Sequence, residues 1–312
     1  MTAIEKAFQK QYERMLYYSP YNYLREIGKE THFDFLRQQL NPWLEAKQHY
    51  FVFETSINNA DFYFLYRYLP WDTEYFRSPT YKLFLVLYKT EDYFILKKAV
   101  EAFKKHLNQY SKGYCFGEIP AEDSLLLQAF TANNFRLAET RLNYYYDQVN
   151  QFNYERFPVR PATENDIPLL RKTAAENRNN FDRYHADIFF TPEQADHYLA
   201  TYAEACQKTL ADLVLLPGEK DISPDAFMAI SRLSEDAAFL KTGFARILLT
   251  AVGPACKGWH LKLAAETIQQ AKAWDSRYVL MTTQATNRAV FRTSEKLGFK
   301  LGSTTHLLSL TF

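Results

Sequence analysis

An internal repeat constrains the fold of this chain more than any other feature of its sequence. Residues 114–146 align without gaps with residues 278–310, at an offset of 164. Each segment opens with an apolar stretch of strand length, followed by a polar N-cap candidate, a helical stretch and a turn that precedes a phenylalanine. The matched positions are Asp123 and Asn287 at the helix starts, and Asn134 and Gly298 at the turns. The repeat predicts one strand–helix–strand unit that is used twice. Chance similarity is the alternative, since few of the aligned residues are identical.

The length of 312 residues favours two domains. Residues 147–158 form a polar, aperiodic stretch between the two copies and are the best linker candidate. Strand-sized apolar runs alternate with amphipathic helical stretches, which indicates an α/β (α+β) class. We therefore expect domains at 1–150 and 151–312, with extra helices at the start of the first domain.

Charge and cysteine content exclude several classes of protein. The net charge is +1, from 37 basic and 36 acidic residues, and the basic residues form no cluster typical of nucleic-acid binding. The longest apolar runs fall far short of the ~20 residues that span a bilayer. Residues 1–19 predict an amphipathic helix rather than a signal peptide. The three cysteines cannot all pair and lack metal-ligand spacing. We expect a cytoplasmic protein with no nucleic-acid, membrane or metal partner.

Four stretches of the second half, in order, resemble the GNAT (GCN5-related N-acetyltransferase) superfamily. They are similar to an opening strand with its helix cap, a fourth strand, a pyrophosphate loop, and an Asn-led helix that ends in Gly-Phe. The stretches are 159–167, 248–254, 257–262 and 284–299. The resemblance implies tandem GNAT-like mixed sheets flanked by helices, in which the C-terminal copy binds the cofactor.

Further stretches are similar to a narrower group, the dTDP-amino-dideoxyhexose (dTDP-fucosamine) N-acetyltransferases. These enzymes carry a GNAT-like N-terminal half without cofactor, which would account for the repeat. The similar stretches are 70–76, 119–141 and 182–187. The resemblance covers roughly Tyr63 to the C-terminus, and residues 1–62 match nothing that we can name.

The resemblance implies acetyl-CoA as co-substrate. Backbone N–H groups at a helix N-terminus would hold its pyrophosphate, and a bulged strand would direct an N–H at the thioester carbonyl. The implied cofactor-binding residues are Thr250, Ala251, Val252, Lys257, Gly258, Trp259, His260, Leu261, Lys262, Asn287 and Phe291.

Three positions depart from the family pattern. His260 stands where the loop usually has glycine, and Lys262 where it has glycine or alanine. Ser294 stands where a tyrosine commonly protonates the CoA sulfur. We take Ser294 and His306 as the candidate catalytic residues, with His260 as a second imidazole. Either histidine has a plain structural role as its alternative.

The loop 183–187 is the candidate acceptor contact. Arg183 suits bidentate binding of a diphosphate, and His185 and Asp187 suit ordering of a sugar hydroxyl. A structural loop held by an Arg–Asp pair is the alternative.

The sequence thus predicts an acetyl-CoA-dependent N-acetyltransferase that acts on a small primary amine, possibly a nucleotide-linked amino sugar. It would act by direct attack on the thioester, and a homodimer is left open. A catalytically degenerate tandem-GNAT binding or scaffold protein is the alternative, motivated by His260, Lys262 and Ser294. A third candidate, a transferase that takes its acyl group from a charged tRNA, is disfavoured by the near-neutral charge.

Overall fold

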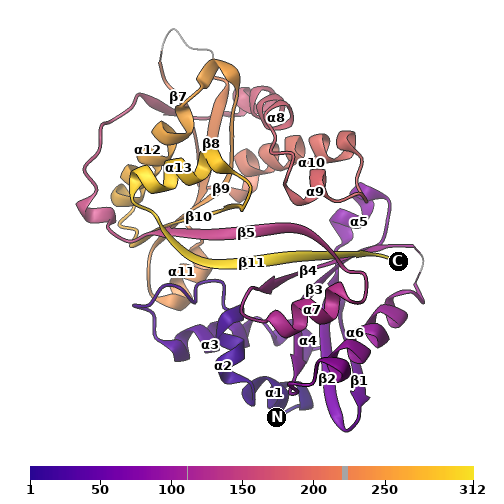
Figure 1. Cartoon of the computed structure of the whole chain (residues 1–312). Helices are drawn as coiled ribbons and strands as arrows, with labels where there is room; N and C mark the ends of the chain where they lie inside the picture. Colours follow the sequence, from indigo (N-terminus) through magenta and orange to yellow (C-terminus); the bar gives the residue numbers. More distant parts are fainter. Residues whose placement is uncertain (111, 220–223) are drawn as a thin grey trace. The chain divides into compact units, whose positions relative to one another are not determined.

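The structure is a computed structural model of the whole chain that describes residues 1–110, 112–219 and 224–312 (Figure 1). The chain divides into two compact units. Unit 1 comprises Met1–Thr140 and Ser303–Phe312, and unit 2 comprises Arg141–Gly302.

Unit 2 is a mixed sheet with helices on both faces. Its strands run in the order β5-β10-β9-β8-β7-β6. The strands are β5 (Arg136–Tyr146), β6 (Val159–Pro161), β7 (Leu213–Pro217), β8 (Ala226–Ser231), β9 (Phe244–Val252) and β10 (Tyr278–Gln284). The helices are α8 (Ile167–Glu176), α9 (Arg183–Ala186), α10 (Pro192–Ala205), α11 (Ser234–Leu240), α12 (Trp259–Ala273) and α13 (Arg288–Leu297).

Two hydrophobic cores hold the layers of unit 2 together. Helices α12 and α13 bury apolar side chains such as Leu263, Ile268 and Val290 against one face of the sheet. Helix α8 packs Leu170, and α10 packs Ala203, against the other face. Figure 1 shows these two pairs of helices on opposite sides of β8 and β9.

Unit 1 is built in the same way. Its strands run in the order β1-β2-β3-β4-β11. They are β1 (Tyr50–Ile57), β2 (Ala60–Tyr68), β3 (Thr80–Tyr88), β4 (Tyr114–Pro120) and β11 (Lys300–Thr311). The helices are α1 (Ala3–Gln9), α2 (Tyr12–Tyr18), α3 (Lys29–Gln38), α4 (Asn41–Leu44), α5 (Pro70–Phe76), α6 (Tyr93–Leu107) and α7 (Ser124–Thr131). Helices α6 and α7 cover one face of the sheet, and the N-terminal helices cover the other.

The structure confirms the repeat and extends it. Strands β3 and β4 pair in parallel from Thr80↔Tyr114 to Leu83↔Gly117. Strands β9 and β10 pair in parallel from Phe244↔Tyr278 to Ile247↔Met281, which is the same register shifted by 164. The helix caps also correspond, because Asp123 accepts a hydrogen bond from Leu126 N and Asn287 accepts one from Val290 N. The turn residues Asn134 and Gly298 both have positive φ, 68° and 81°, as a left-handed helix end requires.

The division into units differs from the predicted domains 1–150 and 151–312. The boundary lies at residue 140, and the last ten residues belong to unit 1. The reason is strand pairing: β11 pairs with β4 from Thr305 to Thr311, while the end of β5 pairs with β10 from Arg141 to Tyr146. The final strand of each repeat therefore completes the sheet of the other repeat.

The predicted fold class is confirmed, since both units are mixed sheets flanked by helices. In the part of the chain that the structure describes, no helix combines the length and apolar character that a bilayer crossing demands.

Candidate active site

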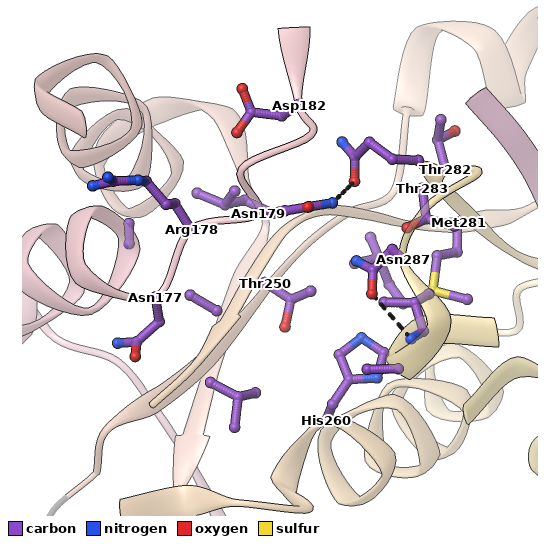
Figure 2. Close-up of a pocket in the computed structure, with 18 of the residues that line it drawn as sticks. Asn177, Arg178, Asn179, Asp182, Thr250, His260, Met281, Thr282, Thr283 and Asn287 are labelled. Carbon is purple, nitrogen blue, oxygen red and sulfur yellow. Dashed lines mark hydrogen bonds between the residues drawn. The ribbon is translucent and has the colours of Figure 1, made fainter. Parts of the chain in front are cut away.

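A cleft opens in unit 2 where β9 and β10 separate. The two strands pair only as far as Ile247 and Met281, although β9 continues to Val252 and β10 to Gln284. The cleft holds a cavity of about 430 Å³. Figure 2 shows Thr250 on one wall, with Met281, Thr282 and Thr283 on the other.

A β-bulge lies in the strand at this parting. The register of β8 against β9 shifts between Ala229 and Ile230, which leaves Leu248 as the extra residue of β9. A bulge increases local twist and bends the bulged strand, so it favours the divergence of β9 from β10. Beyond the bulge, the Thr250 hydroxyl donates to the Phe227 carbonyl at 2.9 Å, which fixes this side chain against β8.

One end of the cleft meets the N-terminus of α12. This helix begins after Gly258, whose φ of 92° suits glycine. Gly258, its N-cap residue, has no side chain to cap the first turn, and that turn holds no acidic residue. Its N–H groups and helix dipole therefore favour an anion. Lys257 is exposed directly before this turn and adds positive charge to it.

His260 faces the cavity from the first turn of α12 (Figure 2). Its Nδ1 lies 3.0 Å from the Thr293 hydroxyl, which itself donates to the Ala289 carbonyl at 3.2 Å. Because the hydroxyl proton of Thr293 is directed at Ala289, this arrangement favours the tautomer in which Nδ1 donates and Nε2 carries the lone pair. Nε2 is buried and has no hydrogen-bond partner among the described residues. Burial lowers the pKa of His260 to about 4, so the ring is neutral at pH 7 and presents an acceptor.

The neighbouring loop residues do not fill the cleft. Trp259 is 2% exposed and belongs to the hydrophobic core under the sheet. The Lys262 ammonium forms an ion pair with Glu219 at 3.0 Å and lies 4.5 Å from the Trp259 ring centroid. Leu261 packs against the same core as Trp259.

The predicted cofactor-binding residues thus divide into two groups. The residues that line the cavity are Thr250, Ala251, Val252, His260 and Asn287. Those at or behind the start of α12 are Lys257, Gly258, Trp259, Leu261 and Lys262. Phe291 does not line the cavity, and its ring lies 6.5 Å from that of Tyr144.

The two candidate catalytic residues do not lie in this cleft. Ser294 is fully buried, and its hydroxyl donates to the Val290 carbonyl at 2.8 Å, a back-bond that short hydroxyl side chains form within helices. His306 belongs to unit 1, where its Nδ1 lies 3.0 Å from the Thr140 hydroxyl. Neither residue lines the cavity, so the geometry of this cleft gives no support to their assignment as proton donors.

The predicted acceptor loop reaches the cavity through other residues than those named from the sequence. Arg183 is buried with its guanidinium over the Tyr184 ring at 4.2 Å, and Asp187 is buried and accepts from Phe189 N at 3.1 Å. Neither these two nor His185 lines the cavity. The loop residues that do are Asn177, Arg178, Asn179 and Asp182.

These four residues were missed, although their sequence signal was present. They lie in the polar segment 177–182 that follows α8, directly before the predicted contact residues 183–187. Asn179 Nδ2 donates to Gln284 Oε1 at 2.9 Å, which joins the loop to β10 (Figure 2). The loop therefore forms a polar wall of the cavity opposite α12.

His185 fixes this wall from behind. Its ring bridges two carboxylates, with Nδ1 at 2.7 Å from Asp182 and Nε2 at 3.0 Å from Asp196. Burial lowers the pKa of His185, but the hydrogen bonds and negative charges of these aspartates outweigh burial, and the net pKa is raised. Asp196 also pairs with Arg178, so one network connects α9, α10 and the cavity wall.

Comparisons with known proteins bear on the fold. No protein-family model and no curated protein matches the sequence. A GCN5-related N-acetyltransferase from Sphaerobacter thermophilus is similar with a TM-score of 0.53 at 10% identity, over 88% of this chain and 85% of that chain. A conserved protein of unknown function from Staphylococcus epidermidis gives a TM-score of 0.52 at 16% identity, over 79% of this chain and 90% of that one.

A Drosophila protein is similar over 96% of both chains, with a TM-score of 0.50 at 11% identity. At such identities the likeness concerns the fold. Together with the parted strands, the bulge and the start of α12 at Gly258, it leads to one statement: the chain has the fold of the GCN5-related N-acetyltransferases.

Proposed function

We propose that unit 2 is an acyl-CoA-dependent N-acyltransferase, with acetyl-CoA as donor and a small primary amine as acceptor. The observation that carries the proposal is the open cleft between β9 and β10, which ends at an uncapped helix N-terminus. An extended amide-bearing arm with phosphates at one end matches that combination of a strand edge and an anion site.

The residues present fit this donor at three points. The uncapped N–H groups of α12 and the side chain of Lys257 would bind the phosphates. The strand edge at Thr250 and Val252 would hydrogen-bond the arm. His260 Nε2, an acceptor without a partner among the described residues, would take a hydrogen bond from an N–H of the arm. When bound, the donor supplies an acyl group activated as a thioester.

The chain's own groups account for positioning and polarisation. An N–H of the bulged strand would polarise the acyl carbonyl. On the acceptor side, the carboxylate of Asp182, which also holds His185, would bind an ammonium group, and the guanidinium of Arg178, which also pairs with Asp196, would bind a phosphate. This pairing of charges suits an amine that also carries phosphate, so a nucleotide-linked amino sugar is the first acceptor to test.

A calorimetric titration with acetyl-CoA, followed by a thiol-release assay with a panel of amines, tests the proposal. Ala289 is exposed, lies on α13 and lines the cavity, so Ala289→Trp should fill the cleft and abolish binding. Lys296→Trp, at an exposed position of the same helix that does not line the cavity, is the matched control and should bind normally. Absence of binding heat in the unaltered protein at millimolar acetyl-CoA would refute the proposal.

A catalytically inactive binding protein is the second candidate. It is favoured by the burial of Ser294 and by the ion pair that occupies Lys262. Acetyl-CoA binding with no thiol release from any amine tested would favour this candidate. Turnover with any amine would exclude it.

A further inference from the structure

Unit 1 contains the same parted strands as unit 2. Strands β3 and β4 pair only as far as Leu83 and Gly117, after which β3 continues to Tyr88 and β4 to Pro120. The register of β2 against β3 also shifts between Leu65 and Tyr66, at positions that match Ala229 and Ile230 at the offset of 164. The backbone features that open the cleft of unit 2 therefore recur in unit 1.

The cleft of unit 1 is filled by the chain's own N-terminal segment. Gln11, at the start of α2, accepts a hydrogen bond from Tyr88 N through Oε1 at 3.1 Å. Arg14, on α2, donates from Nη2 to the Val86 carbonyl at 2.9 Å. At the offset of 164, Tyr88 and Val86 correspond to Val252 and Thr250, the residues of the open strand edge in unit 2.

The same segment also binds the helix cap of unit 1. Asp123, the equivalent of Asn287, receives Arg14 Nη1 at 2.8 Å, Tyr18 OH at 2.6 Å and Tyr88 OH at 2.5 Å. The Arg14 guanidinium lies 3.8 Å from the centroid of the Tyr88 ring. The space that remains beside Tyr18, between the parted strands, has no room for a water molecule.

The anion site at the end of the cleft has also changed in unit 1. Helix α6 follows β3 as α12 follows β9, but Asp92 caps it by accepting from Phe94 N at 2.8 Å and Ile95 N at 3.2 Å. A carboxylate on the first-turn N–H groups satisfies them internally and repels a phosphate.

We propose that α2 with Gln11 is an intramolecular ligand of unit 1, which occupies the cleft that an acyl donor occupies in unit 2. The side chains of Gln11 and Arg14 take the strand-edge N–H and C=O that an amide-bearing arm would otherwise take. This assigns a role to the N-terminal helices, for which the sequence offered none. Only the reference to a donor in unit 2 rests on the proposed function; the self-occupied cleft of unit 1 does not.

Amide hydrogen exchange on the full-length protein tests this assignment at one pair of residues. Tyr88 N–H should exchange slowly without any added ligand, and acetyl-CoA should leave its rate unchanged. Val252 N–H, its equivalent, should exchange faster and become protected when acetyl-CoA is added. Gln11→Met should accelerate exchange at Tyr88 at least tenfold, because it removes the acceptor, whereas Gln11→Glu keeps an acceptor and should retain protection.

The assignment would be overturned by exchange at Tyr88 as fast as at ligand-free Val252, or by a Tyr88 rate that Gln11→Met leaves unchanged. Protection of Tyr88 by acetyl-CoA in the unaltered protein would also overturn it, because unit 1 would then bind the donor. A Val252 rate that does not respond to acetyl-CoA contradicts the proposed function instead. The Tyr88 measurements decide the role of α2 in either case.

Discussion

Replacing His260 with phenylalanine should make the stability of unit 2 less sensitive to acid, because the folded protein holds the pKa of this histidine below its usual value. Burial lowers the pKa of His260 to about 4, whereas an unfolded histidine titrates near 6.5. The unfolded state therefore binds more protons between these values, and stability falls as pH falls through that window. With these two pKa values, proton linkage at this residue alone lowers the free energy of unfolding by about 2.5 kcal/mol between pH 7.5 and pH 4.5.

His260→Phe removes the titrating group and also the acceptor that lacks a partner among the described residues. The difference in free energy of unfolding between the variant and the unaltered protein should therefore grow by about 2.5 kcal/mol, in favour of the variant, as pH falls from 7.5 to 4.5. The assay is urea denaturation of both proteins at half-unit pH steps, since other titrating groups cancel in the difference.

Thr293→Val is the control, because it removes the partner of Nδ1 but leaves the imidazole in place. Its stability should retain the steep dependence on pH. If the curves of His260→Phe and the unaltered protein stay parallel over the whole range, the buried neutral imidazole is not present and the reasoning fails. A second consequence has the opposite sign: His260→Phe should weaken acetyl-CoA binding about tenfold, because the arm loses one hydrogen bond.

Three further outcomes are expected. Gly253→Ala places a Cβ 1.7 Å from Asp225 Oδ2, the far end of a side chain that can rotate away, and the backbone φ of -83° suits alanine; we therefore expect urea denaturation to show a loss of at most about 1 kcal/mol in unfolding free energy. Glu219→Gln releases Lys262 from its ion pair at 3.0 Å, so acetyl-CoA should bind a few-fold more tightly at low salt, and the gain should vanish at high salt. The pKa of His185 is raised in the folded protein, so its positive charge stabilises the fold fully below the unfolded pKa near 6.5, and this stabilisation is lost as pH rises through the folded pKa. The amides of 182–196 should therefore lose protection from hydrogen exchange as pH rises through the folded pKa. His185→Gln should abolish this pH-dependent loss of protection.

The internal repeat made much of the fold predictable from the sequence. Apolar periodicity and the matched caps at Asp123 and Asn287 gave the order of elements in both copies. The pairing partners of the strands were harder to predict, because β5 and β11 have the same apolar pattern and the same position in their repeats. Periodicity states which face of a strand is buried and not which neighbour it pairs with. The exchange of the final strands, and with it the unit boundary at Thr140, therefore required the structure.

The parts of the candidate site that backbone geometry determines could be predicted from the sequence. The parts that depend on where a side chain finds its hydrogen-bond partner could not. The strand edge at Thr250–Val252 follows from the position of the strand before a helix. Ser294, by contrast, was placed by counting along the helix from Asn287, and counting does not reveal that a short hydroxyl satisfies itself on the Val290 carbonyl. His306 was placed on the closing strand of the second repeat, which the strand exchange moves to unit 1.

The two units together provide an argument about function that neither provides alone. A parted strand edge exposes N–H and C=O groups, and leaving such groups buried without partners costs about 1–3 kcal/mol each. Unit 1 meets this cost with Gln11 and Arg14, so the sequence is able to close such a cleft with its own side chains. Unit 2 keeps a cavity of about 430 Å³ at the same backbone position, next to a helix whose N-cap residue, Gly258, has no capping side chain. A scaffold role requires no such opening, whereas a ligand that supplies the missing hydrogen bonds does, and this contrast favours ligand binding in unit 2.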